Sequence, residues 1–142
     1  MERPRVLIVE DEFLVAYELR LHLEESGFEV CGMVGTGAEA VAVAERTRPD
    51  CVLMDVSLKG DMDGIEAARK VVDRRRVPFV FMTGLPVAQV REQVRELDAA
   101  ACLSKPVNFA ELRRMILELV GAEIWGASPG TETPVTRRSS LG

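Results

Sequence analysis

The sequence predicts an α/β domain in which a parallel β-sheet is covered by helices on both faces. Two observations lead to this fold class. Through the first 120 of 142 residues, short apolar runs rich in β-branched residues alternate with stretches whose apolar residues recur at helical spacing. The runs at 6–9, 51–54 and 79–82 are apolar throughout, which is typical of central strands buried on both faces. A single domain of this length can bury a sizeable core.

Strands are expected at 5–9, 29–34, 51–55, 77–82 and 101–104, and helices at 13–26, 37–47, 65–74, 87–97 and 108–120. The run at 29–34 is more mixed in character, which favours a place at an edge of the sheet. Gly27 follows the first helix as a C-terminal stop, and Asn108 is a good N-cap for the last. The last two helices each carry one apolar stripe that is expected to face the core: Val87, Val90, Val94 and Leu97, then Phe109, Leu112, Met115, Ile116, Leu119 and Val120.

The composition indicates a cytoplasmic protein. A net charge of −5 gives no support for a surface that binds nucleic acid or an anionic membrane. No apolar run approaches the roughly 20 residues that span a bilayer, and the first residues do not form a signal peptide. Cys31, Cys51 and Cys102 are odd in number and lie in predicted strands, so buried reduced thiols explain them better than disulfides.

The composition changes at Gly121, after which Gly, Ser, Thr, Pro and Arg dominate. Such a segment lacks the apolar residues needed to bury a core of its own. We therefore expect one domain over residues 1–120, followed by a tail over residues 121–142 that is mostly disordered.

Acidic and basic residues follow three of the predicted strands. Glu10 and Asp11 come after the first strand, Asp55 ends the third, and Lys105-Pro106 follows the fifth. Open parallel sheets place their sites where the carboxyl ends of the strands meet, so these side chains are expected to converge. Two carboxylates ~4 Å apart repel by about 4 kcal/mol at an effective dielectric constant of about 20. The cluster therefore needs a divalent cation, together with the lysine.

The chemistry that suits this cluster is phosphoryl transfer to Asp55. A carboxylate that attacks phosphorus needs a metal to neutralise the incoming oxygens and a fixed cation to hold the product. The expected Mg²⁺ ligands are Glu10, which binds directly or through water, and Asp11, Asp55 and the backbone carbonyl of Ser57. The residues expected around the phosphoryl group are Thr83, which supplies a hydroxyl, Gly84, which leaves room, and Lys105, which supplies a charge.

The first predicted helix carries two apolar stripes. Val15, Leu19 and Leu23 fall on one face, which is expected to pack on the sheet, with His22 at its margin. Nearly opposite lie Phe13, Leu14, Tyr17 and Leu21. Scattered surface apolar residues are common, but a second stripe favours a docking surface for a helical partner.

Taken together, these residues resemble the receiver domain of bacterial two-component response regulators, over roughly residues 3–120. The matching motifs are Val-Glu-Asp-Glu at 9–12, Leu-Met-Asp-Val at 53–56, Met-Asp-Gly-Ile-Glu-Ala-Ala at 62–68, Met-Thr-Gly at 82–84 and Ser-Lys-Pro at 104–106. The resemblance implies the doubly wound, flavodoxin-like fold, with five strands in the order 2-1-3-4-5 and five helices.

The resemblance also implies roles for the site residues. Asp55 matches the phosphoacceptor, and Glu10 and Asp11 match the acidic pair that holds Mg²⁺. Thr83 matches the switch hydroxyl and Lys105 the lysine of the motif.

The resemblance further implies partners. The family takes its phosphoryl group from a histidine kinase or a histidine phosphotransfer protein, which would dock on the second stripe of the first helix and near Pro106. A downstream protein would bind the face formed by the fourth helix, fifth strand and fifth helix. We expect a monomer or weak dimer whose only catalysis is its own phosphorylation and dephosphorylation.

The chain departs from the common family pattern in three ways. Cys102 stands where the family usually has an aromatic switch residue, so phosphorylation is expected to move Thr83 and the 84–88 loop without an aromatic gate. The segment 57–64 is longer and more polar than the common Pro-Gly-Met-Asp-Gly version. No output domain is visible after the receiver pattern, which favours a stand-alone, single-domain regulator. The run at 81–86 is partly similar to that of a subgroup of stand-alone receivers.

Two alternatives remain open. The first is a pseudo-receiver that is not phosphorylated and acts as a protein-interaction module. The second is a phosphohydrolase with an aspartate nucleophile; those resembling the haloacid-dehalogenase family need a second aspartate two residues after the first, where this chain has Ser57.

Overall fold

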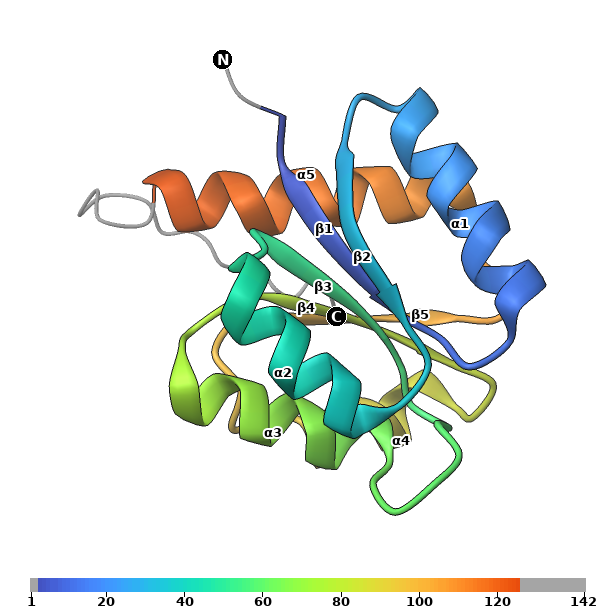
Figure 1. Ribbon diagram of the computed structural model, residues 1–142, viewed down its shortest axis with the longest axis vertical. Coiled ribbons are helices and arrows are strands. Elements are labelled where there is room, and N and C mark those ends of the chain that lie inside the picture. Colours follow the sequence, from blue (N-terminus) through green and yellow to red (C-terminus); the bar gives the residue numbers. More distant parts are fainter. Residues whose placement is uncertain (1–2, 126–142) are drawn as a thin grey trace.

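The computed structural model describes residues 3–125, and within them it contains a parallel five-stranded sheet in the order β2-β1-β3-β4-β5 with five helices (Figure 1). This arrangement confirms the predicted fold class and strand order. The elements are β1 (Arg5–Val9), α1 (Phe13–Glu25), β2 (Glu29–Val34), α2 (Gly37–Thr47), β3 (Cys51–Asp55), α3 (Gly64–Arg74), β4 (Phe79–Thr83), α4 (Val87–Gln93), β5 (Ala100–Ser104) and α5 (Phe109–Trp125).

Helices α1 and α5 cover one face of the sheet, while α2, α3 and α4 cover the other (Figure 1). Side chains of β1 alternate between the two layers, so that Val6 and Ile8 pack with α1 and α5 whereas Leu7 and Val9 pack with the other three helices. All four side chains are fully buried. Burial on both faces is the physical reason why the central runs are apolar throughout.

Several local predictions are confirmed. The mixed run forms β2, which lies at the edge of the sheet. Gly27 has a φ of +94°, and it follows the end of α1 in the left-handed conformation that glycine adopts at little cost. The Asn108 side chain accepts a hydrogen bond from the backbone N–H of Glu111 at 2.9 Å, as an N-cap should. Cys51 and Cys102 are buried free thiols, and Cys31 is half-buried.

The predicted end of α4 was wrong, since this helix stops at Gln93 instead of 97. The backbone N–H of Val94 is shared between the carbonyl oxygens of Val90 and Arg91, and Leu97 N–H bonds to Val94 O at 2.9 Å. These tighter turns end the helix, yet Val94 is buried and Leu97 packs against the same core. The apolar stripe therefore identified core residues correctly but did not define the length of the helix.

The predicted end of the last helix at residue 120 is too early, because α5 continues to Trp125. Gly121 marked a change in composition, but residues 122–124 are Ala, Glu and Ile, which a helix accommodates. The rest of the predicted tail, residues 126–142, lies outside the described residues. Within residues 3–125, none of the helices combines the length and the apolar character that crossing a bilayer requires.

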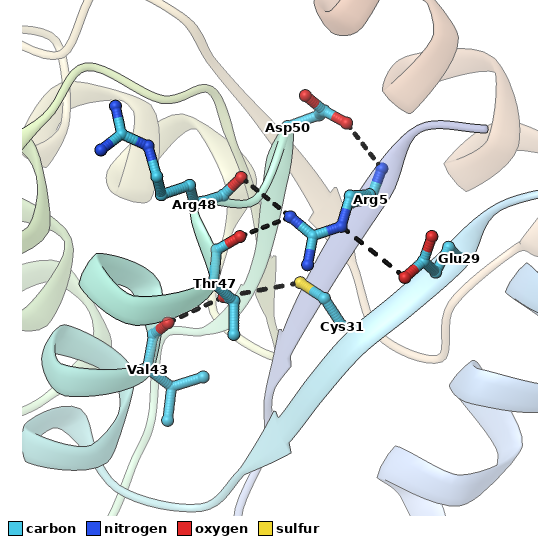
Figure 2. Close-up of polar contacts among 7 residues, drawn as sticks. All are labelled: Arg5, Glu29, Cys31, Val43, Thr47, Arg48 and Asp50. Atoms are coloured by element: carbon cyan, nitrogen blue, oxygen red, sulfur yellow. Dashed lines mark hydrogen bonds and ion pairs between the residues drawn. The ribbon is translucent and has the colours of Figure 1, made fainter. Parts of the chain in front are cut away.

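Arg5, the first residue of β1, connects this strand to β2 and to the end of α2 (Figure 2). Its guanidinium donates hydrogen bonds to the carbonyl oxygens of Thr47 and Arg48, at the C-terminus of α2. Its Nε lies 3.7 Å from Oε2 of Glu29, and its backbone N–H donates to Oδ2 of Asp50 at 2.7 Å. Because helix C-termini carry unpaired carbonyls and partial negative charge, the guanidinium stabilises the helix end as well as the sheet edge.

Candidate functional site

Three carboxylates meet at the carboxyl edge of the sheet. Glu10, Asp11 and Asp55 each offer an oxygen, and these oxygens all lie within 4.8 Å of one another. We call them the acidic cluster. The convergence follows from the sheet register, which pairs Val9 with Met54 on neighbouring parallel strands and so brings the next residues of β1 and β3 together. Glu10 and Asp55 are each only 3% exposed, and Asp11 is half-buried.

Each carboxylate of the acidic cluster accepts one hydrogen bond from a backbone N–H. The N–H of Glu12 donates to Glu10 Oε2 at 3.1 Å, and that of Ser57 donates to Asp55 Oδ1 at 3.0 Å. The third donor comes from the β3–α3 loop, where Lys59 N–H bonds to Asp11 Oδ2 at 3.1 Å. One oxygen of each carboxylate is therefore held by the main chain, and the second oxygens of Glu10 and Asp55 face the Lys105 ammonium.

Lys105 brings a positive charge to the acidic cluster. Its backbone N–H donates to Thr83 O at 2.8 Å, which aligns the ends of β4 and β5. Its ammonium lies 3.2 Å from Asp55 Oδ2 and 3.5 Å from Glu10 Oε1. Burial alone would lower the pKa of this lysine, but the negative charges of Asp55 and Glu10 outweigh burial and raise it. Lys105 therefore stays protonated beside the nucleophile candidate.

Glu10 has a strongly perturbed carboxylate. Burial, reinforced by the charge of Asp55, raises its pKa from 4.5 to about 7, against the opposing effects of the Glu12 N–H and Lys105. Its Oε1 atom is buried and accepts no hydrogen bond from the described residues. An unsatisfied carboxylate oxygen among two further carboxylates is the donor set that a hard cation such as Mg²⁺ prefers. The residues present thus fit the expected metal.

Thr83, Gly84 and Ser57 lie at the carboxyl ends of two strands: Thr83 ends β4, Gly84 follows it, and Ser57 comes two residues after β3. Thr83 is fully buried, and its hydroxyl accepts a hydrogen bond from the backbone N–H of Leu85 at 2.8 Å. A side chain at Gly84 would meet no atom within 4 Å, so the space beside it is open. Ser57 is exposed, and its N–H is the one that holds Asp55.

Gly64, the first residue of α3, contributes to the site in a way that sequence analysis missed. Its N–H donates to Val56 O at 3.0 Å, and a Cβ at this position would lie 2.1 Å from the backbone oxygen of Asp55. The helix start therefore packs directly against the main chain of Asp55, which requires a glycine. The signal available in the sequence was the glycine of the motif at 62–68.

The second apolar stripe of α1 is exposed as predicted. Phe13, Leu14, Tyr17 and Leu21 are 68%, 77%, 45% and 45% exposed, whereas the opposite face of the helix is buried. Pro106, two residues after the end of β5, is also exposed. This stripe is available for contact with a partner.

His22 links α1 to α5. Its ring stacks on that of Phe109, with the ring centroids 3.6 Å apart. The margin position expected for His22 is thus part of the packing between these two helices.

Comparison with known proteins gives the family. A family model described as the response regulator receiver domain matches residues 6–117. The chain belongs to this family. Receiver domains of two-component systems are signalling domains, in agreement with the resemblance seen in the sequence.

One curated relative of this receiver domain is the transcriptional regulatory protein PdtaR of Mycobacterium tuberculosis, which is 41% identical over 108 residues. The match covers 76% of this chain and 52% of that protein, so the chain spans about half the length of this relative.

Two solved structures resemble the receiver domain closely. The signal receiver domain of a modulated diguanylate cyclase from Desulfovibrio desulfuricans G20 has a TM-score of 0.79 and 33% identity, covering 88% of this chain and 99% of that one. The receiver domain of sensor histidine kinase PA1611 from Pseudomonas aeruginosa PAO1 has a TM-score of 0.73 and 32% identity, covering 84% and 98%. That structure has a magnesium ion coordinated in its active site cleft.

Proposed function

We propose that this receiver domain accepts a phosphoryl group on Asp55 from a histidine kinase or a histidine phosphotransfer protein. The reaction depends on Mg²⁺, and the phosphorylated protein signals by phosphorelay or by binding a downstream partner. The observation that carries this proposal is the surroundings of Asp55. This buried carboxylate has a lysine ammonium 3.2 Å from Oδ2, and it belongs to a trio of carboxylates whose oxygens lie close enough together to share a hard cation.

The chemistry is a single displacement at phosphorus. A carboxylate oxygen of Asp55 attacks the phosphoryl group, the bond to the donor histidine nitrogen breaks, and an acyl phosphate forms. Glu10, Asp11, Asp55 and the backbone carbonyl of Ser57 would hold Mg²⁺, which would neutralise charge on the phosphoryl oxygens. Lys105, which already faces Asp55 Oδ2, pairs with another of these oxygens. The protein itself catalyses no reaction beyond its own phosphorylation and dephosphorylation.

Thr83 is the residue that responds to phosphorylation of Asp55. Its hydroxyl accepts a hydrogen bond from Leu85 N–H at 2.8 Å and donates one to Leu85 O at 3.4 Å, so it must give up the donated bond to contact a phosphoryl oxygen. The acyl phosphate adds about −1.5 to −2 charges, which attract the hydroxyl inward. Cys102 is buried and has no aromatic ring to swing. The signal therefore leaves through the 84–88 loop and reaches the face formed by α4, β5 and α5.

The kinase or phosphotransfer protein docks on the exposed stripe of α1, next to Pro106. An amphipathic helix or helical bundle covers such a stripe by burying its apolar side chains. Phe13 and Tyr17 stack at a centroid distance of 6.1 Å, which gives the partner a continuous aromatic surface.

The proposal is tested by labelling the purified chain with acetyl phosphate, with and without Mg²⁺, and measuring the intact mass. We expect Mg²⁺-dependent addition of one phosphoryl group to the wild type and none to Asp55→Asn. Asp61→Asn is the matched control, because Asp61 is an exposed carboxylate outside the acidic cluster. Labelling that survives in Asp55→Asn would contradict the assignment. Absence of labelling together with absence of any Mg²⁺-induced spectral change would instead favour the pseudo-receiver.

A further inference from the structure

One hydrogen bond joins the β3–α3 loop, residues 56–63, to the acidic cluster across 48 positions of sequence: Lys59 N–H to Asp11 Oδ2, at 3.1 Å. The other two carboxylates receive their backbone bonds from residues two positions further along the chain. Those bonds are local and form wherever the strand ends. The bond to Asp11, in contrast, exists only if the loop follows its observed path.

Core packing on both sides of Lys59 fixes the path of the loop. Leu58 is only 7% exposed and belongs to the core beneath α2 and α3, and Met62 packs against the same core. A Cβ at Gly37 would lie 3.0 Å from the Met62 side chain, so the glycine at the start of α2 makes room for this anchor. Between the anchors, Gly60 has a φ of +103°, which turns the chain at little cost only because it is glycine.

The atom that matters in Lys59 is the amide N–H and not the ammonium. The side chain is exposed and forms no ion pair with the described residues. Proline carries no N–H, so this loop offers a donor that a proline at the same place lacks.

We infer that Lys59 is a positioning residue for the metal site: its N–H holds Asp11 by Oδ2 and leaves the other oxygen for the cation. The inference rests on the proposed role of Asp11 as a Mg²⁺ ligand. Hydrogen-bond partners of ligating carboxylates fix the orientation of the ligand, and their loss typically weakens metal binding by about 10- to 100-fold. The loop thus links metal binding to the segment that borders Asp55.

The test compares Lys59→Pro, which removes the donor, with Lys59→Ala, the conservative variant that retains it and removes the ammonium. Lys59 does not have a positive φ, so its backbone has the same sign of φ as proline requires. Mg²⁺ dissociation constants are measured on the full chain by isothermal titration calorimetry. We expect Lys59→Pro to weaken binding by about 10-fold and Lys59→Ala to keep the wild-type affinity.

A second measurement covers the case in which Lys59→Pro does not fold. Amide hydrogen exchange at Lys59 is followed by NMR in the wild type and in Asp11→Ala, and exchange should be faster when the acceptor is removed. Unchanged exchange, an unchanged Mg²⁺ affinity of Lys59→Pro, or equal weakening by Lys59→Ala would each overturn the inference.

These results are separable from failure of the proposed function. If the wild type binds Mg²⁺ through Asp11 while Lys59→Pro binds it equally well, only the inference fails. If the wild type binds no Mg²⁺, the metal site of the proposed function fails, and the inference fails with it.

Discussion

Replacing Gly64 with alanine tests how closely the start of α3 determines the position of the phosphoacceptor candidate. The added Cβ would lie 2.1 Å from the backbone oxygen of Asp55, 2.9 Å from its carbonyl carbon and 3.0 Å from Met54 Cγ. Ordinary contacts begin at 3.4 Å, so the helix start and the end of β3 must separate by more than an ångström. The first clash is with main-chain atoms, which cannot rotate away as a flexible side chain can.

The expected cost has two parts. Overpacking of this kind destabilises proteins by about 1–3 kcal/mol. The larger effect falls on the chemistry, since a displacement of ~1 Å can lower the rate of a positioned reaction by about 10²-fold. We therefore expect Gly64→Ala to fold with reduced stability and to be labelled by acetyl phosphate about two orders of magnitude more slowly than the wild type.

Gly27→Ala is the control for loss of stability alone. Gly27 has a φ of +94° with no atom within 4 Å of an added Cβ, and it lies in the turn between α1 and β2, at the amino-terminal edge of the sheet. Its replacement should cost about 1–2 kcal/mol and leave the labelling rate unchanged. Stability is measured by urea unfolding without Mg²⁺, and labelling by initial rates at saturating Mg²⁺. A wild-type rate for Gly64→Ala, or equal slowing by both glycine variants, would refute the reasoning.

Three further predictions concern charge. Without Mg²⁺, the free energy of unfolding should fall as the pH rises from 4.5 to about 7, because the raised pKa of Glu10 lets the folded state bind a proton that the unfolded state has lost. Urea unfolding at several pH values should show this fall, and the Glu10→Gln variant should not. Lys105→Met should raise Mg²⁺ affinity severalfold by calorimetry, since a positive charge 3.2 Å from Asp55 is removed, yet slow acetyl phosphate labelling. Arg5→Met should lower the free energy of unfolding by about 1–2 kcal/mol without changing the labelling rate, because its bonds to Thr47 and Arg48 lie at the other edge of the sheet.

The sequence was sufficient for features that depend on local patterns or on the general geometry of parallel sheets. Buried strands such as β1 and β3 are apolar on both faces, so their positions can be read without knowledge of their neighbours. The convergence of Glu10, Asp55 and Lys105 follows because parallel strands bring their carboxyl ends to one edge whatever the details of packing.

Features that depend on the path of one segment relative to another could not be predicted. The bond from Lys59 to Asp11 requires a loop path set by Leu58 and Met62, and nothing in the residue types shows that a lysine amide faces a distant carboxylate. The end of α4 is similar, since its apolar stripe continues to Leu97 although the chain has already left the helix. In each case the path of the chain depends on tertiary contacts, which a local sequence pattern does not reveal.

The charges of the site and the stability of the fold are linked through the acidic cluster, where burial and mutual repulsion both disfavour the charged carboxylates. In the absence of metal, Lys105 and a proton on Glu10 offset this repulsion. Burial, reinforced by the charge of Asp55, raises the pKa of Glu10, and the charges of Asp55 and Glu10 raise the pKa of Lys105. A divalent cation that displaces the proton removes the same repulsion, and its binding to the folded state alone stabilises that state. The arrangement that makes the apo site costly is therefore the source of its affinity for Mg²⁺, and affinity should rise across the pH range in which Glu10 loses its proton.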